Sequence, residues 1–181
     1  LRVVGLDLPL PVLSIVLPVG ISFYTFQALS YTIEVYRGTL RARRHFIDFA
    51  AFVSLYPQLV AGPIERAAHI LPQVEQPRTF SWTAARTALL LIVWGYFKKL
   101  VIADRLALYV NDVYGAPENY NGLQLTLATV FFAYQIYCDF SGYSDIAVGS
   151  ARILGFRMMV NFNDPYCSTS VSEFWRRWHI S

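Results

Sequence analysis

The residues best suited to chemistry lie near the end of the chain, where the sequence reads SVSEFWRRWHIS. This stretch contains His179, whose imidazole exchanges a proton near neutral pH. Ser170 and Glu173 match the S-x-x-E capping box, which predicts a helix that begins at Ser170. On such a helix Trp175 and Arg176 would neighbour His179, at spacings of four and three residues. The histidine could then act as general base on a hydroxyl, or it could be an interface or packing residue.

A second polar stretch, YCDFSGYSD, places two carboxylates and several hydroxyls directly after an apolar run. If it is helical, Asp139 shares one face with Tyr143, Ser141 shares another with Asp145, and Asp145 reaches Arg152 seven residues on. Ionisable groups at membrane depth are turned inward, paired, or line a polar path. The stretch therefore predicts either a network of ion pairs and hydroxyls that holds helices together, or part of a substrate path.

Other kinds of site find little support in the sequence. His45 and His69 are 24 positions apart and have no third residue at metal-ligand spacing. Cys138 and Cys167 form no CxxC pattern, which indicates buried thiols. No glycine-rich phosphate loop, GxSxG or HExxH motif occurs. The basic residues lie at the ends of apolar runs, whereas a nucleic-acid-binding protein gathers them on one solvated face.

The composition indicates that membrane-spanning helices position these groups. Of the 181 residues 55% are hydrophobic and 15% charged, against about a quarter charged in soluble domains. Residues 8–33 and 119–138 form uncharged runs of 26 and 20 residues, and about 20 are needed to cross a bilayer. Three prolines lie at the start of the first run, and proline disfavours the interior of a helix. The regular helix of this run is therefore expected from about Pro18 to Tyr36. A third span is expected over 82–97, with an amphipathic continuation to residue 110.

The remaining segments are expected to be a broken apolar stretch and polar connections. Residues 49–64 are uncharged but contain Pro57, Gly62 and Pro63, which predicts a re-entrant or interfacial segment or a helix on the membrane surface. Residues 65–86 and 111–122 read as loops. Four arginines between positions 37 and 44 assign that loop to the cytoplasm. The expected fold class is all-α, a polytopic bundle of transmembrane helices with re-entrant or broken helices.

Five sequence blocks, found in order along nearly the whole chain, resemble the membrane-bound O-acyltransferase family. The resemblance is to its alginate O-acetylation branch, which is related to the D-alanyl transfer protein of teichoic acid synthesis. The blocks are LPVGISFYTFQALSYTIEVYRG, DFAAFVSLYPQLVAGPIERA, GYFKKLVIADRLA, YCDFSGYSDIAVGSARILGF and VSEFWRRWHIS.

The resemblance implies a multi-pass enzyme of the bacterial inner membrane with a buried tunnel. An acyl group, with acetyl favoured, would pass from a cytoplasmic thioester, acetyl-CoA or another carrier, to an extracytoplasmic hydroxyl on a partner protein or exopolysaccharide. His179 would be the first of two active-site histidines, and the second, in a Trp-His-Gly context, would lie beyond Ser181. Residues 1–181 would then be the central part of one membrane domain, incomplete at both ends and inactive alone, with no bound cofactor or metal.

The same resemblance suggests which residues border the tunnel and leaves other functions open. The polar cluster of Asp139, Ser141, Tyr143 and Asp145 would border the path. Arg176 could aid the donor or merely flank the membrane. The acyl group could instead be D-alanyl. The protein could also be a non-catalytic conduit or scaffold for partner acyltransferases. A secondary transporter is a weaker alternative, because no inverted repeat is visible.

Overall fold

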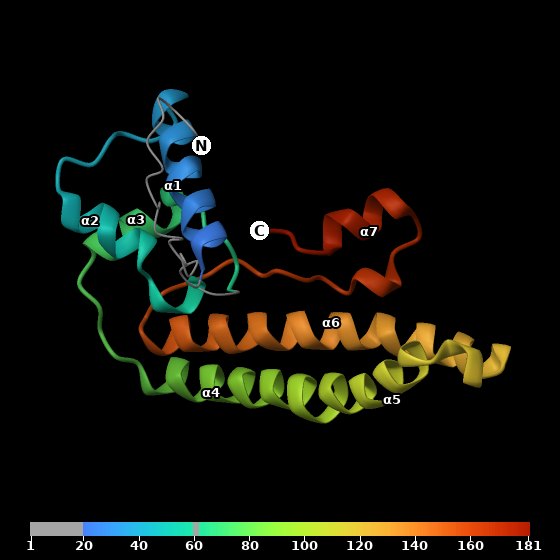
Figure 1. Cartoon of the computed structure of the whole chain (residues 1–181). Helices are drawn as coiled ribbons and strands as arrows, with labels where there is room; N and C mark the ends of the chain where they lie inside the picture. The colour runs from blue at the N-terminus through green and yellow to red at the C-terminus, as the bar shows by residue number, and fades with distance from the viewer. Residues whose placement is uncertain (1–19, 60–61) are drawn as a thin grey trace, which may run out of the picture.

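The computed structural model describes residues 20–59 and 62–181, and the regular secondary structure of these residues is helical (Figure 1). The α-helices are α1 (Ile21–Tyr36), α2 (Phe46–Val53), α3 (Ala67–Glu75), α4 (Trp82–Tyr96), α5 (Asp104–Gly115), α6 (Gly122–Ile153) and α7 (Val171–Arg177). A π-helix, Phe97–Ala103, joins α4 to α5, and short 3-10 turns cover Tyr56–Gln58, Pro117–Asn119 and Pro165–Cys167. The all-α prediction is confirmed for the part that the structure describes.

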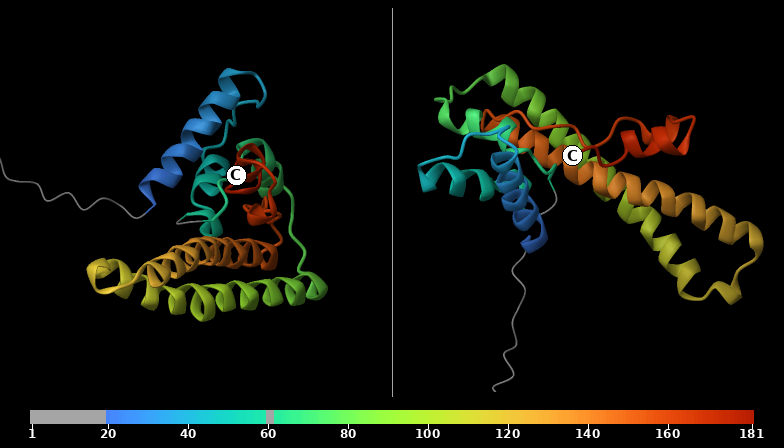
Figure 2. Two further views of the ribbon diagram at one scale, coloured as in Figure 1. Left: turned by 90° about the vertical axis from the view of Figure 1, so that its right-hand side faces the viewer. Right: turned by 90° about the horizontal axis from the view of Figure 1, so that it is seen from above.

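The helices form two layers. The continuous rod of α4, the π-helix and α5 lies beside α6 over most of its length, and the two run in opposite directions. The cluster of α1, α2 and α3 lies on one side of this pair, together with the segment that follows α6 (Figure 2). This segment crosses back over α6 and carries α7 and the C-terminal residues.

The cluster of short helices has its own apolar core. Phe52 of α2 and three residues of α3, Ala67, Ile70 and Leu71, are fully buried in it. The prediction of a loop over 65–86 is therefore wrong for 67–75. Apolar side chains at i, i+3 and i+4 specify one buried helical face there, and the helix forms even though it contains Pro72.

The long helices begin at side-chain caps. Asn121 and Gln124 form a reciprocal capping box at the start of α6, with both hydrogen bonds 3.0 Å long. The helix then runs for 32 residues to Ile153. It includes both the predicted span at 119–138, apart from its first three residues, and the acidic stretch that was expected to follow that span. The apolar run at 82–97 likewise continues as helix, through the π-helix into α5.

Within residues 20–59 and 62–181, the structure contains no helix whose length and apolar character would let it cross a bilayer. The predicted start of the first span near Pro18 falls outside the described residues, and α1 is 16 residues long where it is described. The stretch at 49–64 is broken, as expected, because α2 ends at Val53 and a 3-10 turn follows. Of the two cysteines, Cys138 is buried as expected, but Cys167 is exposed.

Helices α4 and α6 approach each other most closely at two glycines. A Cβ atom added at Gly142 would lie 2.7 Å from the carbonyl oxygen of Gly95, and one added at Gly95 would lie 2.6 Å from the carbonyl oxygen of Gly142. Both distances are too short for any side chain. The crossing therefore requires glycine on both helices.

We expect Gly142→Ala to lower the free energy of unfolding by about 1 to 3 kcal/mol, because its methyl group forces the two backbones apart. Thermal unfolding of the purified protein measures this loss. Gly122→Ala is the matched control, since a Cβ there meets nothing within 4 Å and alanine favours the helix. Equal unfolding midpoints for the two variants would contradict the close crossing.

Candidate active site

His179 does not lie on a helix, contrary to the sequence-based expectation. Helix α7 begins at Ser170, as predicted, but ends at Arg177, and Trp178 is extended with φ −99° and ψ 126°. The chain leaves the helix because it pairs with an earlier segment. The amide of Asn163 donates to the carbonyl of Arg177 at 3.0 Å, and the amide of Ile180 donates to the carbonyl of Asn161 at 2.9 Å.

The neighbours of His179 also differ from those that helical spacing predicted. Trp175 is 64% exposed, and the Arg176 guanidinium donates to Ser172 within α7. The half-buried imidazole instead meets the edge of Phe140 on α6, with ring centroids 4.9 Å apart. The expected contacts of His179 with Trp175 and Arg176 are therefore wrong.

The backbone of His179 adopts an unusual conformation. Its φ is +49°, in the left-handed region, which L-residues other than glycine rarely occupy because the Cβ atom crowds the following carbonyl. Such conformations persist only where the surroundings enforce them, and they cluster at functional sites. The pairing of the C-terminal residues with 161–163 provides that enforcement here.

Asn161 is the centre of this pairing. Its side chain is 2% exposed, and its amide nitrogen donates to the Ser144 hydroxyl of α6 at 3.1 Å. Its Oδ1 accepts from the Ser181 hydroxyl at 2.7 Å. The Ser181 oxygen in turn accepts from the amide of Ile64 at 3.2 Å. One buried amide thus ties α6, the segment after it and the C-terminal residues together beside His179.

The carboxylates of the YCDFSGYSD stretch pair with the two lysines of the π-helix. Lys98 lies 2.5 Å from Asp145, and Lys99 lies 2.6 Å from Asp139 and 2.8 Å from Asp104. Both lysines of the π-helix therefore point toward carboxylates. The network of ion pairs between helices is present, whereas Asp145 pairs with Lys98 and not with Arg152.

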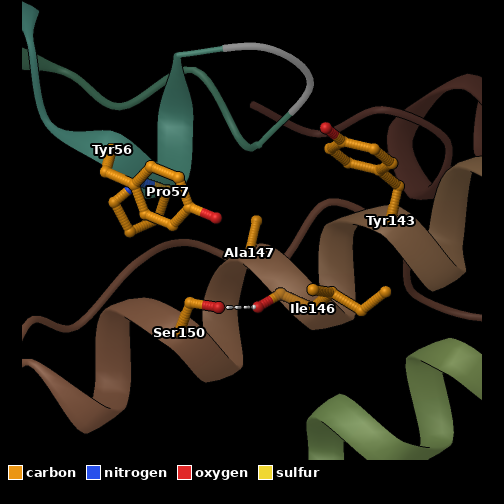
Figure 3. Close-up of a pocket in the computed structure, with 6 residues that line it drawn as sticks. All are labelled: Tyr56, Pro57, Tyr143, Ile146, Ala147 and Ser150. Carbon is orange, nitrogen blue, oxygen red and sulfur yellow. Dashed lines mark hydrogen bonds between the residues drawn. The ribbon is translucent and has the colours of Figure 1, made fainter.

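Two of the cavities along α6 divide three of the predicted tunnel residues between them. Ser141 and Asp145 line a cavity of about 280 Å³, where the buried Ser141 hydroxyl has no hydrogen-bond partner among the described residues. Tyr143 lines a separate space of about 80 Å³, opposite Tyr56 and Pro57 of the 3-10 turn (Figure 3). The residues around the larger cavity are Leu91, Lys98, Tyr137, Ser141, Ser144, Asp145, Val148, Arg152, Met158, Val160, Asn161 and Phe162.

The structure therefore brings together only some of the predicted site residues. Ser141 and Asp145 share one cavity with Asn161, which fixes the segment of His179. Asp139 and Arg176 line neither cavity, and neither does His179. Asn161 was not identified from the sequence, where a lone asparagine after an apolar helix has no distinguishing pattern. The partners of Lys98 and Lys99 depend on the way that the helices pack.

Charged groups also stabilise the start of α7. The amide and hydroxyl of Thr169 both donate to Glu173 at 2.8 Å, and Arg177 lies 2.5 Å from the same carboxylate. These donors lower the pKa of Glu173 from 4.5 to about 2. Ser170 caps the helix by accepting from the Glu173 amide at 3.1 Å. In a capping box Glu173 would accept from the amide of the N-cap residue Ser170. Here it accepts from the amide of Thr169, one residue earlier.

Both a family model and individual known proteins match this chain. Residues 37–181 match the family model described as MBOAT, membrane-bound O-acyltransferase family. The chain is 44% identical to a protein of Azotobacter vinelandii named probable alginate O-acetylase, over 96% of this chain and 34% of that protein.

More distant relatives carry other names. The chain is 32% identical to the peptidoglycan O-acetyltransferase of Helicobacter pylori, over 93% of this chain and 37% of that protein. It is 28% identical to the teichoic acid D-alanyltransferase of Bacillus subtilis, over 90% of this chain and 42% of that protein. The chain spans about a third of the length of the Azotobacter vinelandii protein.

We expect Asn161→Ala to destabilise the protein by about 1 to 3 kcal/mol, because the buried Ser144 hydroxyl loses its partner and the Ser181 hydroxyl loses its acceptor. Thermal unfolding measures the loss. Ser144→Ala removes only one of these bonds and should cost less. If Asn161→Ala unfolds at the wild-type temperature, Asn161 does not organise this region.

Because the folded state lowers the pKa of Glu173, its contribution to stability is complete above pH 4.5 and is lost as the pH falls toward 2. Amide hydrogen exchange in α7, followed across this range, should show the helix opening progressively in the wild type. Glu173→Gln should remove most of this dependence, while the control Glu118→Gln in the turn Pro117–Asn119 should keep it. An unchanged profile in Glu173→Gln would refute the role of this carboxylate.

Proposed function

The chain belongs to the membrane-bound O-acyltransferase family, and from this premise we propose that it carries part of the active site of an O-acyltransferase. The enzyme would move an acyl group from a cytoplasmic thioester donor to a hydroxyl of an extracytoplasmic acceptor. It would act as a multi-pass protein of the bacterial inner membrane. Its donor would be acetyl-CoA or another acyl thioester.

The observation that carries the proposal is the placement of His179. The half-buried imidazole lies against Phe140 in a backbone conformation with φ +49°. A histidine that only filled space would not need this conformation, which costs about 1 to 3 kcal/mol. Asn161 and the strand-like pairing hold it in place. A fixed imidazole is what proton transfer requires, since a base must stay within hydrogen-bond reach of the proton that it accepts.

In the proposed reaction His179 takes the proton of the acceptor hydroxyl. The hydroxyl oxygen attacks the thioester carbonyl carbon, a C–O bond forms and the C–S bond breaks. The thiolate leaves with the electron pair of that bond and takes up the proton from the imidazole. A second histidine, expected in a Trp-His-Gly context from the family resemblance, would assist. Holding donor and acceptor in line would supply much of the rate.

The larger cavity supports a polar path beside this histidine. Its wall contains the free hydroxyl of Ser141 and the Asp145–Lys98 ion pair. A hydroxyl without a partner in a buried place is costly, so a ligand that bonds to it gains affinity. In this proposal Ser141 and Asp145 border the path. Asp139, Tyr143 and Arg176 would act at its margins.

The names of the relatives favour acetyl as the acyl group. Identity is 44% to the protein named for alginate O-acetylation and 28% to the teichoic acid D-alanyltransferase of Bacillus subtilis. An exopolysaccharide of the alginate kind, or a partner protein that passes the group on to it, is the proposed acceptor. D-alanyl transfer to a cell-wall polymer is the alternative within the same chemistry.

A non-catalytic conduit or scaffold is the competing function, and one observation favours it. His179 lines none of the three cavities that border α6 in the described part of the chain. In that case the imidazole would serve the packing against Phe140. The two functions differ in what happens when the imidazole is replaced.

We expect His179→Asn to lower acyl transfer by a factor of about 10² to 10⁴, because the general base is lost. Asparagine tolerates the left-handed backbone, so the thermal unfolding midpoint should change little. The assay uses the complete protein in membranes, a labelled thioester donor and the isolated acceptor polymer.

His45→Asn is the matched control, because His45 is an exposed histidine at the start of α2. It should transfer at the wild-type rate. If His179→Asn also transfers normally at normal membrane levels, the catalytic role is wrong and the scaffold function is favoured.

A further inference from the structure

A polar pocket of about 470 Å³ lies away from His179, where α3 and the loop after it meet the chain that leaves α6. We call it the basic pocket. Two arginines, one histidine, two glutamines and one glycine line it: His69, Gln73, Gln76, Arg78, Gly155 and Arg157. Neither the ion pairs of the π-helix nor the site of His179 uses these residues.

The walls of the basic pocket are fixed by hydrogen bonds. The Gln73 carboxamide binds the backbone of Arg157 twice, donating to its carbonyl and accepting from its amide, both at 2.9 Å. The fully buried Glu65 accepts from the amide of Met159 and lies 2.6 Å from Nδ1 of His69. Helix α3 is thereby clamped to the segment 157–159, and the pocket keeps its shape without a ligand.

Arg78 is held at the pocket by its own contacts. Its guanidinium donates to the carbonyl of Gly155 at 2.6 Å and lies 4.3 Å from the ring centroid of Phe156. Gly155 has φ +82°, and a Cβ there would lie 3.2 Å from Cδ of Arg78. The guanidinium has five N–H donors, so most of its donors remain for another group.

Among the described residues, no acid neutralises the charges of Arg78 and Arg157 in the basic pocket. No carboxylate is among the lining residues within the described chain. Of the two acids nearest in sequence, Glu65 is engaged with His69, and Glu75 lies 2.8 Å from Arg43. The Arg157 guanidinium makes no hydrogen bond or ion pair with the described residues, whereas its backbone makes two.

We propose that the basic pocket binds a phosphate group. The Arg157 guanidinium, the remaining donors of Arg78 and the Gln76 carboxamide line the basic pocket, and guanidinium groups match the oxygens of phosphate. The volume exceeds that of phosphate alone, so the phosphate is one end of a larger molecule. This molecule is either a soluble phosphorylated compound or an anionic lipid with its headgroup in the pocket.

The test is binding to Arg157→Gln in the complete protein in detergent. This variant removes the unpaired guanidinium and keeps the backbone bonds to Gln73, so the fold should survive. Four probes distinguish the ligand: inorganic phosphate, coenzyme A, phosphate-free pantetheine and short-chain phosphatidylglycerol. Calorimetric titration should show at least about tenfold weaker binding of the phosphate-bearing probes, the loss expected for one charge-assisted contact.

Arg105→Gln is the matched control, because Arg105 is exposed on α5 and does not line the basic pocket, and its loss changes the net charge equally. It should bind like the wild type. Tighter binding of coenzyme A than of the lipid supports the soluble source, and the reverse order supports the lipid source.

Three results would overturn the proposal. They are the absence of phosphate-dependent binding to the wild type, equal binding by Arg157→Gln, and an equal loss in Arg105→Gln. Arg78→Gln provides a second variant and should weaken the same probes. Phosphate binding does not depend on the role of His179, because His179→Asn should bind every probe normally whether or not it transfers acyl groups.

Discussion

The buried amide of Asn161 is the interaction on which the arrangement around His179 depends. A buried amide without partners is costly, and this one is satisfied only when Ser144 of α6 and Ser181 of the C-terminal segment both reach it. The same contacts end α7 at Arg177 and place the imidazole of His179 against Phe140. The C-terminal segment that carries His179 is thereby held in one position on α6.

That position also depends on the helix pair below it. The glycine contact lets α4 and α6 approach closely, and the π-helix then turns two consecutive lysines toward carboxylates. The Lys98–Asp145 pair is the more buried of these, and both pairs link the π-helix to α6. Ser141 and Asp145 face the same cavity as Asn161. The polar path that we propose is built on this helix pair.

Local patterns in the sequence predict much of this structure, but the contacts between segments do not follow from them. The cap at Ser170 and the helical face shared by Ser141 and Asp145 are confirmed, because both depend on neighbours along the chain. The helical placement of His179 is wrong, because pairing with residues 161–163 ends α7 early. Nothing in the local sequence distinguishes Asn161, whose partners lie 17 and 20 residues away.

The central claim is that His179 meets a reactive thioester. A structure of the complete protein with a non-hydrolysable thioester analogue tests it most directly. The account predicts a ring nitrogen of His179 within about 3.5 Å of the place that the attacking hydroxyl must occupy beside the thioester carbonyl. An imidazole that faces lipid or bulk solvent, with the analogue bound elsewhere, would contradict it.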